Sequence, residues 1–270
     1  MNRLAECFEQ LKSRHEAALV AYLMAGDPDP LQSLEYAMAL EMGGADIIEL
    51  GLPFSDPVAD GPTIQAASVR SLQAKMTFKS FLQVIREFRA RSKVPLVVLS
   101  YYNPIWKIGE EVFLKQIAEA GVDGVAIPDL PIEEATHWLN QCRKYHMSRI
   151  FFVTPETDDE RAKKIAAQTT GFLYLIPHYG TTGVRDTLSQ QALPLIEHVR
   201  SLTPEGLPLA IGFGLSTKDQ IHAVIQAGAD AAIVGSALVE KIAQGVSPET
   251  LRVFVQELKE GTRRPAPATT

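Results

Sequence analysis

Several features that mark secreted, metal-binding and membrane proteins are scarce in this chain of 270 residues. It has only two cysteines, Cys7 and Cys142, which lie far apart on amphipathic helical patterns, so we expect two small buried side chains and not a disulfide. The six histidines show no metal-ligand spacing, so no metal site is expected. No apolar run approaches the roughly 18–20 residues that span a bilayer.

Basic residues are also too few to suggest a nucleic-acid-binding protein. Lysine and arginine number 26 against 32 acidic residues, which gives a formal charge of −6, and no basic run offers a surface that could follow a phosphate backbone. The first 16 residues form an amphipathic pattern that contains acids and lacks an apolar centre. Neither a signal peptide nor a transit peptide of the usual acid-poor kind is therefore expected, and we predict a soluble cytoplasmic protein.

What the chain does have is a regular alternation of short apolar runs with helical patterns. Continuous apolar strands are typical of parallel sheets that are covered by helices. We expect eight strands, at Ala18–Met24, Ala45–Leu50, Pro95–Tyr101, Val122–Pro128, Arg149–Val153, Phe172–Ile176, Pro208–Gly212 and Ala229–Val234. Eight parallel strands alternating with helices predict an α/β fold, a single (β/α)8 TIM barrel, with a doubly wound open sheet as the alternative.

Smaller signals complete this prediction. Gly44, Gly121 and Gly228 each lie where a helical pattern passes into a strand, as expected for glycines that end helices. Met1–Arg14 is expected to be an extra helix that caps the bottom of the barrel. We predict one barrel domain over residues 1–262 and a disordered, proline-containing tail over residues 263–270.

The segment from Ile48 to Gly61, IELGLPFSDPVADG, carries the first candidate site. Glu49 ends an apolar strand at a position whose side chain should point into the barrel, and Asp60 closes the loop that follows. An acid fixed on a strand and a second acid on a loop suit proton transfer at two points of one substrate. The alternative is an ordinary strand-end charge and an ordinary turn aspartate.

Glycines at the ends of the last two strands form the second candidate site. Gly212 and Gly214 follow the seventh strand, and Gly235 and Ser236 follow the eighth, where barrels commonly bind phosphate with backbone N–H groups. Ser236 is expected to be the N-cap of a short phosphate-site helix over Ala237–Gln244. Gly183, in a long loop from Pro177 to Gln190, is a third possible contact, and plain tight turns are the alternative. Apolar residues near outgoing strand ends could surround an aromatic ligand: Tyr22, Phe54, Ile64, Leu99, Tyr101, Ile127, Tyr174 and Phe213.

These motifs together resemble the α subunit of tryptophan synthase, from about Gly26 to about Gly245. The segment Ile48–Gly61 fits the hallmark of that family closely and is highly specific. Further matching segments are Ala25–Pro28, Pro62–Gln65, Asp129–Pro131, Gly212–Gly214 and Gly235–Ala237. Two departures stand out, namely Pro177-His178-Tyr179 at the start of the loop that contains Gly183, and Tyr22 where the family generally has phenylalanine.

The resemblance implies a lyase that cleaves indole-3-glycerol phosphate into indole and glyceraldehyde 3-phosphate in tryptophan biosynthesis. Indole would pass to a β subunit that carries pyridoxal phosphate (PLP), in an αββα heterotetramer, and this chain would itself need no cofactor. By the resemblance, Glu49 shuttles protons and Asp60 binds the indole N–H. The remaining family roles fall on the phosphate contacts Gly183, Gly212, Gly214, Gly235 and Ser236, on the pocket residues Tyr22, Tyr174, Thr182 and Phe213, and on Pro53 and Asp56 of the β-facing loop.

The chemistry of this reaction agrees with the residues. Carbon–carbon cleavage of this substrate is a retro-aldol step, which needs a proton for indole C3 and an acceptor for the indole N–H. Burial of Glu49 would raise its pKa so that it holds a proton near neutral pH, while Asp60 stays ionised.

Three other functions are alternatives at this stage. The chain could be a stand-alone lyase that releases free indole, or a weakly active subunit whose main role is to activate the β subunit. A phosphate-binding barrel isomerase or epimerase is a more distant alternative. It would predict a metal or a strand-borne lysine or cysteine in the barrel mouth, and the sequence offers neither.

Overall fold

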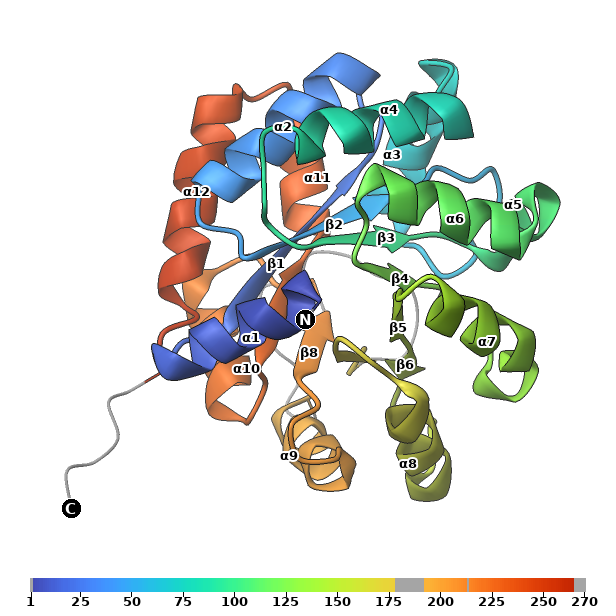
Figure 1. Ribbon diagram of the computed structural model, residues 1–270. Coiled ribbons are helices and arrows are strands. Elements are labelled where there is room, and N and C mark those ends of the chain that lie inside the picture. The colour runs from blue at the N-terminus through green and yellow to red at the C-terminus, as the bar shows by residue number, and fades with distance from the viewer. Residues whose placement is uncertain (1, 178–191, 213, 265–270) are drawn as a thin grey trace.

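The computed structural model describes residues 2–177, 192–212 and 214–264. In this part of the chain all strands belong to one parallel sheet that is surrounded by helices (Figure 1). The strands are β1 Ala18–Met24, β2 Ile47–Gly51, β3 Leu96–Leu99, β4 Gly124–Ala126, β5 Ser148–Ile150, β6 Phe152–Val153, β7 Leu173–Leu175, β8 Leu209–Gly212 and β9 Ala231–Val234.

The sheet closes into a barrel of eight strands. The hydrogen-bonded order runs β5-β4-β3-β2-β1-β9-β8-β7-β6. Its two ends, β5 and β6, are halves of one predicted strand and are separated only by Phe151. The predicted TIM barrel is confirmed, every predicted strand overlaps an observed one, and the open doubly wound sheet is excluded.

Successive side chains of each strand point alternately into the barrel and out toward the helices, so the core has two layers. Val20, Ile47, Val97 and Ala210 belong to a cluster inside the barrel. Their strand neighbours, such as Ile48, lie in a larger cluster between the strands and the helices. A strand points successive side chains to opposite faces, so Glu49 shares the inward face of β2 with Ile47.

Helices surround the strands on the outside of the barrel (Figure 1). They are α2 Pro30–Met42, α3 Pro62–Gln73, α4 Phe78–Arg89, α5 Tyr102–Ile108, α6 Glu110–Ala120, the 3-10 helix η1 Ile132–Glu134, α7 Thr136–Lys144, α8 Asp159–Gln168, α9 Ala192–Leu202, α10 Lys218–Gln226, α11 Ser236–Ala243 and α12 Pro248–Glu260. None of them, in the part of the chain described, is long and apolar enough to cross a membrane.

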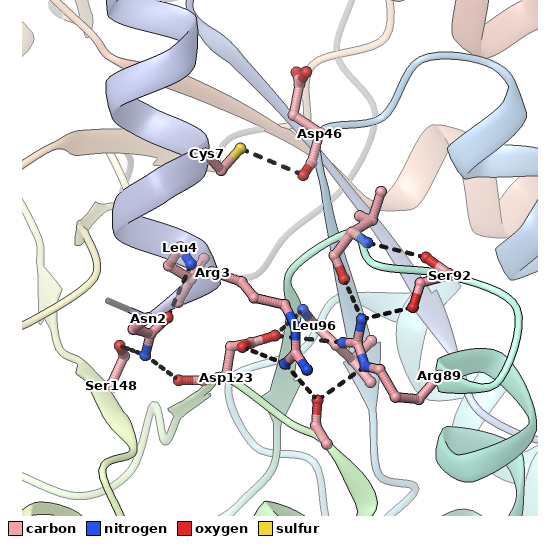
Figure 2. Close-up of polar contacts among 12 residues, drawn as sticks. Asn2, Arg3, Leu4, Cys7, Asp46, Arg89, Ser92, Leu96, Asp123 and Ser148 are labelled. Atoms are coloured by element: carbon pink, nitrogen blue, oxygen red, sulfur yellow. Dashed lines mark hydrogen bonds and ion pairs between the residues drawn. The ribbon is translucent and has the colours of Figure 1, made fainter.

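An extra helix, α1 (Arg3–Ser13), closes the incoming end of the barrel, as predicted (Figure 1). Its N-cap Asn2 accepts a hydrogen bond from the Leu4 N–H and donates to the backbone oxygen of Asp123, the residue before β4 (Figure 2). Arg3 forms an ion pair with the Asp123 carboxylate at 2.8 Å. Leu4 is fully buried in the cluster inside the barrel, so this side chain of the helix covers the end of the barrel core.

The two cysteines are free thiols, as predicted. Cys142 is buried, and Cys7 is half-buried on α1, where its thiol lies 3.6 Å from the backbone oxygen of Asp46 (Figure 2). Burial raises the pKa of the Cys7 thiol to about 12, so the thiolate form is disfavoured.

The end of the described chain is held against the barrel. Arg263 forms an isolated bridge with Glu16, and the Arg264 side chain donates to Asp230 at 2.9 Å. The prediction of a disordered tail is therefore wrong for these two residues, because their backbone and charges find partners at the bottom of the barrel. Residues 265–270 lie outside the described structure, and the domain boundary at residue 262 stays a prediction.

Candidate active site

Glu49 lies on the inward face of β2, beside Tyr22 of β1 and Val97 of β3. Its exposed fraction is 1 %, and its Oε1 atom has no hydrogen-bond partner among the residues described. Burial, and secondarily the nearby charge of Asp60, raises the pKa of Glu49 to about 8. The side chain therefore carries a proton at neutral pH, as the sequence predicted.

Asp60 lies half-buried in the loop between β2 and α3. This loop is fixed at two points: Ser68 of α3 bonds both backbone groups of Phe54, and the Ala59 N–H donates to the Tyr101 hydroxyl at 3.0 Å. Burial raises the pKa of Asp60 to about 6, and a hydrogen bond from Tyr101 opposes the rise. Asp60 is thus mostly ionised at neutral pH while Glu49 is mostly protonated.

One pocket at the outgoing ends of the strands brings the two acids together with the predicted anion-binding residues. It is lined by Tyr22, Glu49, Asp60, Ile64, Leu99, Tyr174, Ile176, Gly212, Gly214, Ile233, Gly235 and Ser236. The acids and the glycines therefore face one cavity, although they come from opposite halves of the sequence. The predicted site residues Thr182, Gly183 and Phe213 lie outside the described residues.

The glycines of the pocket pack closely against its tyrosines. A Cβ atom on Gly212 would lie 2.3 Å from the Tyr174 ring, so this position admits only glycine unless the ring moves. Helix α11 begins next to the pocket at Ser236, with Gly235 as its N-cap. The prediction of Ser236 as N-cap is wrong by one residue, because Ser236 is already the first residue of the helix; it lines the pocket from the first turn.

Two residues of the β2–α3 loop, predicted to face a partner, differ in exposure. Asp56 is exposed and accepts a hydrogen bond from the Ser55 hydroxyl, whereas Pro53 is buried. Neither lines the pocket. Their interface role stays a prediction.

The structure also corrects the predicted apolar lining. Ile127 lies in the cluster between strands and helices, because it faces outward while its neighbour Ala126 faces inward. Phe54 packs on Tyr101 with ring centroids 5.6 Å apart, and neither ring lines the pocket. No pattern in the sequence indicated that Tyr101 is the hydrogen-bond partner of Asp60, since the two residues are far apart in the chain.

Comparison with known proteins decides the family. The profile of the family described as "Tryptophan synthase alpha chain" matches residues 8–266. The chain belongs to the tryptophan synthase alpha chain family. It is 44 % identical over 263 residues to the tryptophan synthase alpha chain of Methanosarcina barkeri, covering 97 % of this chain and 98 % of that one. The alpha chain of Synechocystis is 42 % identical over 262 residues, with 96 % and 98 % covered.

Solved structures agree with this assignment. A chain of the tryptophan synthase of Mycobacterium tuberculosis superposes with a TM-score of 0.90 at 34 % identity, covering 98 % of this chain and 99 % of that one. A chain of the tryptophan synthase complex from Pyrococcus furiosus gives a TM-score of 0.84 at 36 % identity, with 90 % and 98 % covered. As a tryptophan synthase alpha chain, the protein is a carbon–carbon lyase of tryptophan biosynthesis that cleaves indole-3-glycerol phosphate. The isomerase and epimerase alternative is thereby excluded.

Proposed function

We propose that Glu49 and Asp60 divide the cleavage of indole-3-glycerol phosphate between them, Glu49 as the proton shuttle and Asp60 as the acceptor for the indole N–H. The observation that carries this assignment is the opposite protonation of two acids in one pocket. A pKa of about 8 keeps Glu49 protonated at neutral pH, and a pKa of about 6 leaves Asp60 ionised. Two carboxyl groups whose environments separate their pKa values suit paired acid and base roles.

In the proposed step, the protons and electrons are accounted for by the substrate and the two carboxyl groups. Glu49 donates its proton to indole C3, and the positive charge that develops on the ring nitrogen is stabilised by the Asp60 carboxylate. The bond between C3 and the adjacent glycerol carbon then breaks, and its electron pair returns to the ring. The hydroxyl on that glycerol carbon loses its proton to the Glu49 carboxylate and becomes the aldehyde, so the acid is regenerated.

We assign the phosphate of the substrate to the opposite side of the pocket, where Gly212, Gly214, Gly235 and Ser236 lie. The place of these residues in the pocket wall, at and after the ends of β8 and β9, supports this assignment, since backbone N–H groups after the last two strands of a barrel commonly bind phosphate. The first turn of α11 adds N–H groups at the positive end of the helix dipole.

The partner is proposed to be a β subunit that binds PLP and uses the indole released here. The Pyrococcus furiosus relative is a tryptophan synthase complex. Asp56 is exposed on the same loop that carries Asp60, so contact with a partner could change the position of the acid. The alternatives of a stand-alone lyase and of a weakly active activator stay open, and the cytoplasmic location stays a prediction.

Measuring indole release from indole-3-glycerol phosphate, with and without a β subunit, separates these alternatives. A lyase subunit should be slow alone and faster with its partner, and should co-elute with it in size-exclusion chromatography. Full activity alone without co-elution would indicate the stand-alone enzyme. No indole release by the wild-type chain in either condition would contradict the proposed roles of both acids.

A further inference from the structure

Tyr22 of β1 crosses the pocket from the anion-binding side to the acid side. Its exposed fraction is 5 %. At one end, its Cβ and Cδ1 atoms lie 3.5 Å from the position of a Cβ built on Gly235. At the other end, its hydroxyl lies 2.3 Å from the position of a Cβ on Gly51, so only glycine at 51 leaves room for the phenol.

The hydroxyl of Tyr22 has a poor hydrogen-bond partner. Among the residues described, its hydrogen-bond contact is the thioether of Met24 at 4.0 Å, and sulfur is a weak acceptor. Burial, reinforced by the charges of Asp60 and Glu49, raises the pKa of Tyr22 well above its ordinary value, so the group remains a donor. A buried donor without a good acceptor is costly to the folded protein, and this one faces a ligand pocket.

The surroundings of this hydroxyl are apolar. Tyr22 packs in a small cluster with Met24, Ile64, Ala67 and Val239, against which Leu99 also lies. Such a lobe suits the aromatic ring of the substrate, whereas the glycine-rich side suits its phosphate. Within this cluster of described residues, the Tyr22 hydroxyl is therefore the polar group that can donate a hydrogen bond.

We propose that the Tyr22 hydroxyl determines specificity on the aromatic ring of the substrate, by donating a hydrogen bond to a polar substituent on the ring edge that faces it. This inference rests on the proposed function, because it takes the ring to occupy the apolar lobe beside Asp60. The pocket then prefers ring-hydroxylated indoles to methylated ones at that one ring position, since a methyl group leaves the donor unpaired.

The test uses the reverse reaction, condensation of glyceraldehyde 3-phosphate with indoles that carry a hydroxyl or a methyl group at ring carbon 4, 5, 6 or 7. The ratio of kcat/KM for hydroxyindole to that for methylindole is measured at each position for the wild type and Tyr22→Phe. We expect the ratio to fall about tenfold in Tyr22→Phe at one position and to stay constant at the others.

A matched control is Tyr36→Phe on α2, whose hydroxyl donates to the backbone oxygen of Val246 away from the pocket. It should leave all four ratios unchanged, and circular dichroism checks that each variant is folded. Ratios that change less than about twofold at every position in Tyr22→Phe would overturn the inference and leave the roles of Glu49 and Asp60 intact. Failure of the wild type to condense unsubstituted indole would overturn the proposed function and this inference together.

Discussion

Replacement of Glu49 by glutamine should slow catalysis and stabilise the fold at the same time. Glutamine has nearly the same shape as glutamic acid but cannot ionise or donate a proton to carbon. The cleavage rate should fall by about 10²–10⁴-fold or more, the usual range for loss of a general acid. The gain in stability follows from the burial of Glu49, whose exposed fraction is 1 %.

The size of the stability effect comes from the pKa shift. The pKa of Glu49 is about 8 in the folded protein, against an ordinary value of 4.5. Between these values the unfolded chain releases the proton and the folded protein keeps it, so the carboxyl destabilises the fold increasingly as pH rises. At about 1.4 kcal/mol per pKa unit, the effect is on the order of 3 kcal/mol at pH 7 and levels off near 5 kcal/mol above pH 8.

Urea unfolding of the wild type and Glu49→Gln at about pH 5, 7 and 8.5 measures this difference. The free energy of unfolding of the variant, relative to that of the wild type, should rise by about 2.5 kcal/mol between pH 5 and 7. Glu119→Gln, at an exposed position on α6, is the matched control and should show no comparable trend. A difference between wild type and Glu49→Gln that is constant across pH would refute the reasoning, because it would mean that the carboxyl is not shifted.

Three further predictions follow from the pocket. The kcat/KM for cleavage should show a bell-shaped pH profile, falling below about 6 as Asp60 gains a proton and above about 8 as Glu49 loses its own; a flat profile from pH 5 to 9 would contradict both roles. Tyr101→Phe removes the hydrogen bond that holds the Asp60 pKa down, so the acidic limb should move to higher pH by up to about one unit, and a shift to lower pH would be inconsistent with the structure. Gly212→Ala places a Cβ 2.3 Å from the Tyr174 ring and must displace that ring within the pocket, so steady-state kinetics should show KM raised about tenfold or more, whereas an unchanged KM would argue that neither residue helps to bind substrate.

The fold was largely predictable because each barrel strand is a continuous apolar run between helical patterns. The glycines between helices and strands were also predictable. Gly44, Gly121 and Gly228 all adopt positive φ, at 99°, 103° and 105°. The break at Phe151 was not predictable, because a local loss of strand pairing leaves the apolar pattern unchanged. The order of the tail at Arg263 depends on partners far away in sequence.

The candidate site was predictable where chemistry follows from position on a strand. The inward direction of Glu49 follows from period-two alternation, and the glycines follow from their place after the last two strands. The outward direction of Ile127 needed the true register of β4, and the bond from Tyr101 to Asp60 needed the three-dimensional arrangement of two loops. The weak pairing of the Tyr22 hydroxyl with the Met24 thioether, among the residues described, likewise emerges only from side-chain packing.

The protonation of Glu49 can be measured directly by NMR titration of the full chain with ¹³C-labelled glutamate side chains. Comparison with Glu49→Gln identifies the Glu49 carboxyl resonance. The structure predicts a midpoint near 8 for that resonance, because burial disfavours the charged form. A midpoint near the ordinary value of 4.5 would contradict the central claim that this acid enters the reaction protonated.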